Sequence, residues 1–243
     1  MRFLRPFEPQ SHVWVHSTWF IVWVLAGLLI LISALIGKTP DVDWTPFSDQ
    51  SSHLMASMSL WHDQDLRYTL EDLDRFNAQF PAAQGPLGTF LKQNADGALY
   101  LAKPSLYAAL NAPFYGAFGT AGFIIVNMMA IAVMAVLTHH IARRIYGGTL
   151  SHLITAALFL MGPFMAWAMV IHPDLLIALL LYSGGYLTLT QHRLLGWWFA
   201  GFLLGLALSE KPTFVVALPF LLLAVPGHRL RKHGWIIAGI LIG

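Results

Sequence analysis

The chain contains no cysteine and few charged residues. Without cysteine it can form neither disulfide bonds nor metal sites with thiolate ligands. Charged residues make up only 11% of its 243 residues, whereas ordinary soluble domains carry about 25%. Several long stretches contain no charge at all. This combination is typical of an all-α protein that crosses a membrane several times.

Hydrophobic runs predict seven membrane-spanning helices in one transmembrane module. They lie near residues 13–36, 121–141, 150–171, 175–190, 194–208, 214–225 and 235–243. The first run is long enough to cross, because about 20 helical residues span a hydrocarbon core of about 30 Å. A signal peptide is the alternative for that run, although its apolar core would have only about 7–15 residues. The last run is incomplete, so we expect a C-terminal part of the protein to be absent.

The basic residues orient these spans. If the N-terminus is cytoplasmic, every inner turn carries arginine or lysine, as the positive-inside rule requires. The inner basic residues are then Arg2, Arg5, Arg143, Arg144, Arg193, Arg229, Arg231 and Lys232. Acidic residues do not enter this rule, yet eleven of the twelve fall on the outer side. We therefore expect a multi-pass protein with a cytoplasmic N-terminus.

Residues 38–119 form the one long polar stretch, and the orientation makes it an outer loop. It holds nine of the twelve acidic residues but no Asn-x-Ser/Thr glycosylation site. The missing site fits the inner membrane of a bacterium. Carboxylates beside a membrane are expected to face water, to contact a partner or to take part in a reaction. We therefore expect the functional site to lie in this loop and to face outward.

Two helices are expected to lie along the membrane surface within this loop. The first follows Asp49, where Leu54, Met58 and Trp61 recur at helical spacing with serines on the opposite side. The second covers residues 104–118, a mostly apolar segment that contains Pro113. The charged stretch between them, residues 63–75, is expected to be a solvated helix face.

Asp49 and three residues next to prolines are the candidate site residues. Lys103, Asp174 and Lys211 each adjoin a proline on the outer side, and proline suits the first turn of a helix. Helix N-termini attract anions, so the two lysines could bind a phosphate there. The alternative is that the lysines only anchor the chain at the membrane interface. For Asp49 and Asp174 the alternative is helix capping.

Four motifs, taken in order, resemble the GT-C membrane glycosyltransferases. An acidic residue, Asp49, precedes a juxtamembrane helix, and a Tyr-x-x-Lys-Pro-like motif follows at residues 100–107 and leads to Phe-Gly at 118–119. A Pro-Asp pair at 173–174 opens a later helix, and residues 205–213 read GLALSEKPT. The resemblance covers nearly the whole chain and is greatest to the branch with protein O-mannosyltransferases and lipid A sugar transferases.

This resemblance implies transfer of a sugar from a polyprenyl-phosphate donor to a lipid, glycan or protein acceptor at the outer membrane face, with inversion. Asp49 matches the catalytic carboxylate and Lys103 the lysine at the donor phosphate. Lys211, at another predicted helix start, is expected to be a second phosphate ligand. The supporting residues are Asp174, Tyr100 and Tyr107. Membrane lipids are expected partners and nucleic acid is not.

The sequence departs from the family in three ways. Gln50 stands where many relatives have a second acid, and Ala102 stands where some have an acid before Lys-Pro. No metal ligand is therefore assigned and no cofactor is expected with certainty, although a divalent metal is left open. Relatives are also about twice as long or more, so this chain alone is expected to be incomplete and could be inactive.

Two other classes of protein compete with an enzyme. A transporter or flippase would need polar residues in the middle of its spans, whereas here the interiors of the runs are nearly free of charge. A binding protein for polyprenyl-phosphate sugars that has lost its chemistry would carry the same motifs. The sequence alone leaves this second alternative open.

The orientation predicts opposite exposure of two introduced cysteines. Because the chain has no cysteine of its own, single cysteines at Gln64 and Arg231 would be the only reactive thiols. An impermeant maleimide should label the first from outside intact spheroplasts and the second only after lysis. The cysteine-free parent provides the blank. Labelling of both positions from outside would contradict the orientation.

Overall fold

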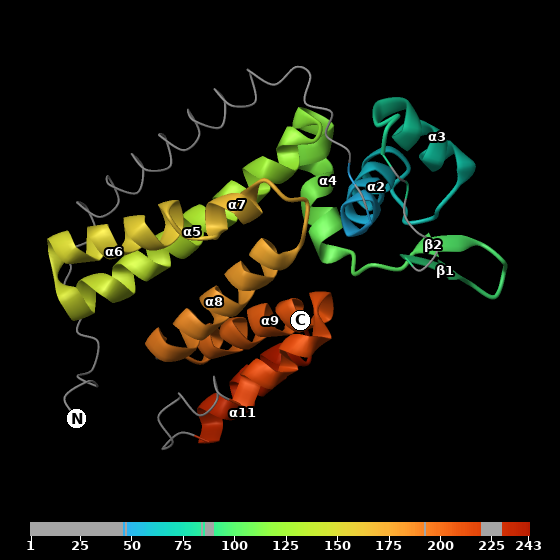
Figure 1. Cartoon of the computed structure of the whole chain (residues 1–243). Helices are drawn as coiled ribbons and strands as arrows, with labels where there is room; N and C mark the ends of the chain where they lie inside the picture. The colour runs from blue at the N-terminus through green and yellow to red at the C-terminus, as the bar shows by residue number, and fades with distance from the viewer. Residues whose placement is uncertain (1–45, 47, 84, 86–89, 192, 220–229) are drawn as a thin grey trace.

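The computed structural model describes residues 46, 48–83, 85, 90–191, 193–219 and 230–243, and these are predominantly helical (Figure 1). The all-α expectation is confirmed for this part of the chain, apart from one small sheet. The expected first span, 13–36, lies outside the described residues, as do residues 220–225 of the sixth.

The segment that the sequence predicts to be an outer loop forms a lobe at one end of the molecule. Its elements are α2 (Asp49–His62), α3 (Leu70–Gln79), β1 (Leu91–Gln93), β2 (Leu99–Leu101) and α4 (Leu106–Phe118). In Figure 1, α4 stands between this lobe and the remaining helices, and α2 lies beside it. Helices are therefore present at both positions where the sequence predicts them.

The remaining helices make two layers (Figure 1). The first consists of α5 (Ala121–Tyr146), α6 (Gly148–Leu160) and α7 (Phe164–Ala168). The second consists of α8 (Asp174–Thr190), α9 (Leu194–Glu210), the 3₁₀ helix η2 (Pro212–Ala217) and α11 (Leu230–Ile240). Helix α8 packs on both α5 and α9, so it joins the two layers.

The helix boundaries correct several of the expected spans. The run 121–141 is α5, which continues to Tyr146, and the next two matching runs are α8 and α9. The run 150–171 is not one helix, because Pro163 cannot continue the hydrogen-bonding pattern and separates α6 from α7. After α9 the chain forms a short 3₁₀ helix where a sixth span was expected to begin. The last helix starts at Leu230, five residues earlier than the apolar run.

One described helix, α5, is long and apolar enough to cross a bilayer by length and composition. Helices α6, α8 and α9 are also apolar, but they are shorter than a helix that spans a bilayer without tilting or thinning it usually is. A helix of 17 residues rises about 25 Å, a little less than a hydrocarbon core of about 30 Å.

Helix α2 is buried, in contrast to the expected surface helix. All nine residues from Ser51 to Ser59 are buried, the serines included. Ser57 Oγ donates hydrogen bonds to His53 O (3.0 Å) and to Ala108 O of α4 (3.2 Å). The small serine side chains let the two backbones approach closely. The backbone carbonyl groups then accept the hydrogen bonds of the Ser57 hydroxyl. The alternation of serine and apolar residues therefore reflects a helix enclosed by protein on all sides.

A β-hairpin that the sequence analysis did not predict follows α3. Strands β1 and β2 pair antiparallel, and the turn between them contains Gly97 with φ of 83°. The backbone of Tyr68 donates to Leu99 O (2.9 Å), so the segment before α3 lines the other edge of β2. Three-residue strands are too short to give a clear alternating pattern.

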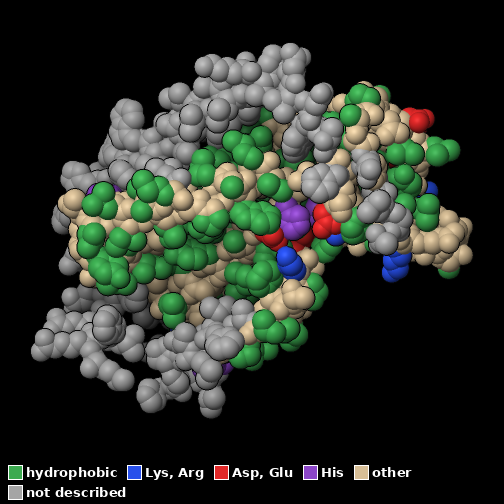
Figure 2. All heavy atoms as spheres, viewed as in Figure 1, with side chains coloured by type: hydrophobic (Ala, Val, Ile, Leu, Met, Phe, Trp, Pro, Cys, Tyr) green, Lys and Arg blue, Asp and Glu red, His purple; other side chains and the backbone are tan. Residues whose placement is uncertain are grey.

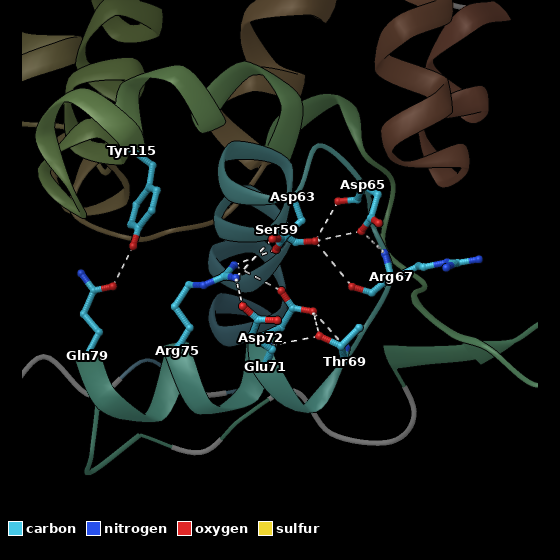
Figure 3. A network of polar contacts seen from close by, with 10 residues as sticks. All are labelled: Ser59, Asp63, Asp65, Arg67, Thr69, Glu71, Asp72, Arg75, Gln79 and Tyr115. Carbon is cyan, nitrogen blue, oxygen red and sulfur yellow. Dashed lines mark hydrogen bonds and ion pairs between the residues drawn. The ribbon is translucent and has the colours of Figure 1, made fainter.

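The charged stretch 63–75 is a network rather than a plain solvated face (Figure 3). Arg75 contacts Asp63 at 2.7 Å and Asp72 at 3.5 Å, and Asp72 is only 5% exposed. Thr69 and Asp72 form a capping box that starts α3. Tyr115 donates to Gln79 at 2.7 Å and ties α3 to α4.

Glycines bring α9 and α11 into backbone contact. A Cβ on Gly201 would lie 2.0 Å from Ile236 O, and one on Gly205 would lie 2.5 Å from Ile240 O. The Gly201-x-x-x-Gly205 segment of α9 therefore packs directly against α11. Close helix contact through small residues is the usual role of this pattern.

Gly201→Ala is predicted to destabilise this contact strongly. The new methyl group meets backbone that cannot rotate away, and overpacking of this kind costs about 1–3 kcal/mol. The melting temperature in detergent should fall. Gly234→Ala on α11 is the control, because nothing lies within 4 Å of its Cβ position. Equal melting temperatures for the two variants would contradict the packing.

Candidate functional site

Charged residues from four separate segments meet in one cluster. Lys103 Nζ lies 2.9 Å from Asp49 Oδ1, and Lys211 Nζ lies 3.1 Å from Asp174 Oδ1. His172 joins the two pairs, since its Nε2 is 3.7 Å from Asp49 Oδ2 and its Nδ1 is 3.2 Å from Asp174 Oδ2. We call these five residues the charge cluster. All four charged residues that the sequence analysis selected belong to it.

Helix ends hold the two carboxylates in place. Asp49 is the first residue of α2, but the N-cap position is Ser48, so the capping alternative is wrong for Asp49. Asp174 is likewise the first residue of α8, after Pro173 at the N-cap. In both cases the side chain reaches a lysine of another segment. The two helices thus aim their first residues at the same region.

The two lysines come from loops at the ends of neighbouring helices. Lys103 lies between β2 and α4, and Lys211 follows directly after α9. Lys103 is only 22% exposed, and its ammonium lies 4.1 Å from the centre of the Phe90 ring. Lys211 is more open, with 43% of its side chain exposed. Each ammonium therefore ends on a carboxylate of the cluster.

Electrostatics keep Asp49 ionised. Burial opposes its negative charge, but the hydrogen bond and positive charge of Lys103 outweigh burial and lower the pKa of the Asp49 carboxyl. Its side chain is still 36% exposed, so a ligand can reach it. The cluster thus presents an anionic carboxylate that is accessible from outside.

His53 is buried next to the cluster, and its imidazole is neutral at physiological pH. Asp49 and His53 are four residues apart and share one face of α2. Burial lowers the pKa of His53 to about 4, and the neighbouring basic groups of His172 and Lys103 add to this effect. Its ring lies 5.9 Å from that of His172 and 5.3 Å from that of Tyr107.

The start of α4 does not offer free N–H groups as the sequence analysis expected. Glu210 Oε1 accepts a hydrogen bond from the backbone N–H of Tyr107 at 3.2 Å, and Glu210 is only 6% exposed. A carboxylate at a helix N-terminus is favourable for the same reason that a phosphate would be. Phosphate binding at this end would therefore depend on the lysine side chains.

The two predicted supporting tyrosines lie outside the cluster. Tyr100 is on β2, and Arg67 Nε donates to its hydroxyl at 3.3 Å. Tyr107 is fully buried and packs between His53 and Phe123. Tyr107 thus supports the floor of the site, whereas Tyr100 belongs to the hairpin.

Three residues of the site were not assigned from the sequence: His172, His53 and Glu210. The first stands two residues before Asp174, and the second follows Asp49 by one helical turn. His172 also adjoins Pro173, which is the signal that selected Asp174. Glu210 caps a helix that begins 104 residues earlier in the chain, and no local pattern predicts such a contact.

The charge cluster does not fit a divalent metal. Its donor set would be two carboxylates and one imidazole, yet an ammonium lies about 3 Å from each carboxylate. Among the described residues, no group of three or more His, Asp or Glu side chains could hold a metal ion. The lysines supply the positive charge that a metal would otherwise bring.

The surface around the cluster is apolar. Figure 2 shows hydrophobic side chains over much of the face, with a small group of acidic, basic and histidine side chains near its middle. Trp167, at 42% exposure, lies beside His172 with ring centres 5.9 Å apart. Such a site can bind an amphiphile whose charged group reaches the cluster.

Comparisons with known proteins found no matching family model, no matching curated protein and no matching solved structure.

The neutral state of His53 predicts an acid-sensitive fold. Between pH 6.5 and about 4 the unfolded chain protonates this histidine while the folded protein does not. The unfolded state then binds more protons, so stability falls as the pH falls through this range. His53→Gln should flatten this part of the curve of melting temperature against pH. His62→Gln, an exposed position on α2, is the control, and identical curves for both variants would contradict the assignment.

Proposed function

We propose that the protein is a polytopic protein of a bacterial inner membrane, with its N-terminus in the cytoplasm and the charge cluster facing outward. The support is a large exposed apolar surface. Met161 is 89% exposed, Leu195 75% and Leu153 62%. Further exposed apolar side chains lie on α5 and α11. Exposure of so many large apolar side chains on several helices is expected where a surface contacts lipid or another protein.

The protein acts as a membrane glycosyltransferase of the GT-C type. It transfers a sugar from a polyprenyl-phosphate donor to a lipid, glycan or protein acceptor. One observation carries this proposal: the four charged residues selected from the sequence, two of which match the family's site residues, come from separate segments and meet in a single cluster. Residues that only capped helices or anchored the chain at the membrane interface would not need to lie close together.

The reaction requires a base and a group that stabilises the leaving phosphate. Asp49 takes the proton of the acceptor hydroxyl as that O–H bond breaks. The acceptor oxygen forms a bond to the anomeric carbon, whose bond to the phosphate oxygen breaks. The electron pair leaves with the polyprenyl phosphate, and Lys103 and Lys211 offset its negative charge. Direct displacement of this kind inverts the anomeric centre.

The ion pair between Asp49 and Lys103 couples donor binding to base strength. While Lys103 contacts the carboxylate, the lowered pKa makes Asp49 anionic but a poor proton acceptor. A donor phosphate competes with Asp49 for the same ammonium. When Lys103 turns to the phosphate, Asp49 loses its partner and gains basicity. The base thus becomes effective only when the donor is present.

Asp49→Asn is predicted to abolish turnover without harming the fold. The amide keeps the size of the side chain but cannot accept the proton, so the rate should fall by roughly 100-fold or more. The assay is release of polyprenyl phosphate from a panel of polyprenyl-phosphate sugars by the full-length protein, with cell-envelope membranes as acceptor. Near wild-type release by the variant would contradict the assignment.

Asp63→Asn is the matched control, because Asp63 also pairs with a basic residue but lies outside the cluster. It should keep its activity. If the wild-type protein binds the donors and releases nothing, it is a non-catalytic binding protein instead.

A further inference from the structure

His172 occupies the centre of the charge cluster and has no role in the reaction described above. It lies between α7 and α8, with one ring nitrogen toward each carboxylate. Its side chain is 22% exposed, so the ring is accessible from the surface. Its imidazole therefore lies between the two carboxylates of the cluster.

The charges of the cluster cancel while His172 is neutral. Lys103 and Lys211 contribute two positive charges, and Asp49 and Asp174 contribute two negative ones. Each carboxylate that faces His172 already has a lysine about 3 Å away. A phosphodiester brings one further negative charge into this neutral group. One additional positive charge would restore the balance.

Several titratable and charged groups surround His172. The titratable and charged groups that face His172 from the described elements are Asp49 and His53 of α2, Lys103 and Tyr107 before and within α4, Asp174 of α8 and Lys211 after α9. Tyr107 is neutral at physiological pH, and burial with the nearby positive charges keeps the pKa of His53 at about 4.

We propose that the site takes up a phosphodiester together with one proton, and that His172 carries this proton. The inference rests on the proposed function, because that function supplies the phosphodiester. The protonated ring then becomes a third cation of the phosphate site, beside the two lysines. It also holds the phosphate next to Asp49, which is the base.

Linked proton uptake makes binding depend on pH. Affinity for the phosphodiester should fall as the pH rises through the range in which histidines lose their proton, with a limiting slope of about tenfold per pH unit for one proton. The lysines stay charged throughout this range and cannot produce the slope. The dependence therefore reports on the imidazole.

The test is calorimetric titration of the full-length protein in detergent with methyl farnesyl phosphate. This diester keeps one negative charge over the whole range, so the probe itself contributes no proton change. Titration in two buffers of different ionisation enthalpy counts the protons bound. We expect about one proton per probe above neutral pH, and tighter binding at pH 6 than at pH 8.5.

Two substitutions separate a charge role from a structural one. His172→Gln should bind more weakly at low pH and lose the dependence on pH. His172→Lys supplies a permanent charge, so it should restore binding at high pH without proton uptake. His62→Gln, remote from the cluster on α2, should behave as wild type.

Binding by the wild-type protein without proton uptake would overturn the role of His172 and leave the proposed function standing. Unchanged pH dependence in His172→Gln would do the same. If the wild-type protein fails to bind the probe at any pH, the proposed function itself fails.

Discussion

The ion pair between Asp49 and Lys103 is the contact on which the site depends. It joins the start of α2 to the loop before α4, at a distance of 2.9 Å. The burial of α2 against α4 fixes both ends of this pair, because serine and glycine let the two helices approach closely. Glu210 then ties the start of α4 to the end of α9. Together these contacts bring the starts of α2, α4 and α8 and the end of α9 to one place.

The balance of charges in the charge cluster affects how an anion can bind there. Two carboxylates and two ammonium groups within salt-bridge distance form a neutral group, although every member is charged. A ligand anion can enter such a group only by exchanging partners or by bringing a proton. Exchange of Lys103 from Asp49 to the phosphate explains how donor binding would activate the base. Protonation of His172 explains how the excess negative charge would be absorbed. Both effects require the same arrangement of residues.

Local patterns predicted a large part of this structure. Apolar runs located α5, α8 and α9, and charged residues beside prolines or at a helix start led to Asp49, Lys103, Asp174 and Lys211. The sequence did not reveal that α2 is enclosed on all sides, because serine is compatible with both solvent and a tight helix contact. The break at Pro163 was missed because the flanking residues are uniformly apolar. Glu210 was missed because its partner is 103 residues away, and Tyr100 was assigned to the site from a motif although its hydroxyl faces Arg67.

The most direct test of the account is whether Lys103 binds the donor phosphate. Binding of methyl farnesyl phosphate should be compared between Lys103→Met and Lys92→Met, a lysine of the hairpin outside the charge cluster. The account predicts a large loss of affinity for the first variant and none for the second. Lys103→Arg should recover only part of the loss, because a planar guanidinium does not replace a compact ammonium between Asp49 and the Phe90 ring. If Lys103→Met binds the probe as tightly as wild type, the phosphate does not bind in the charge cluster and the account is wrong.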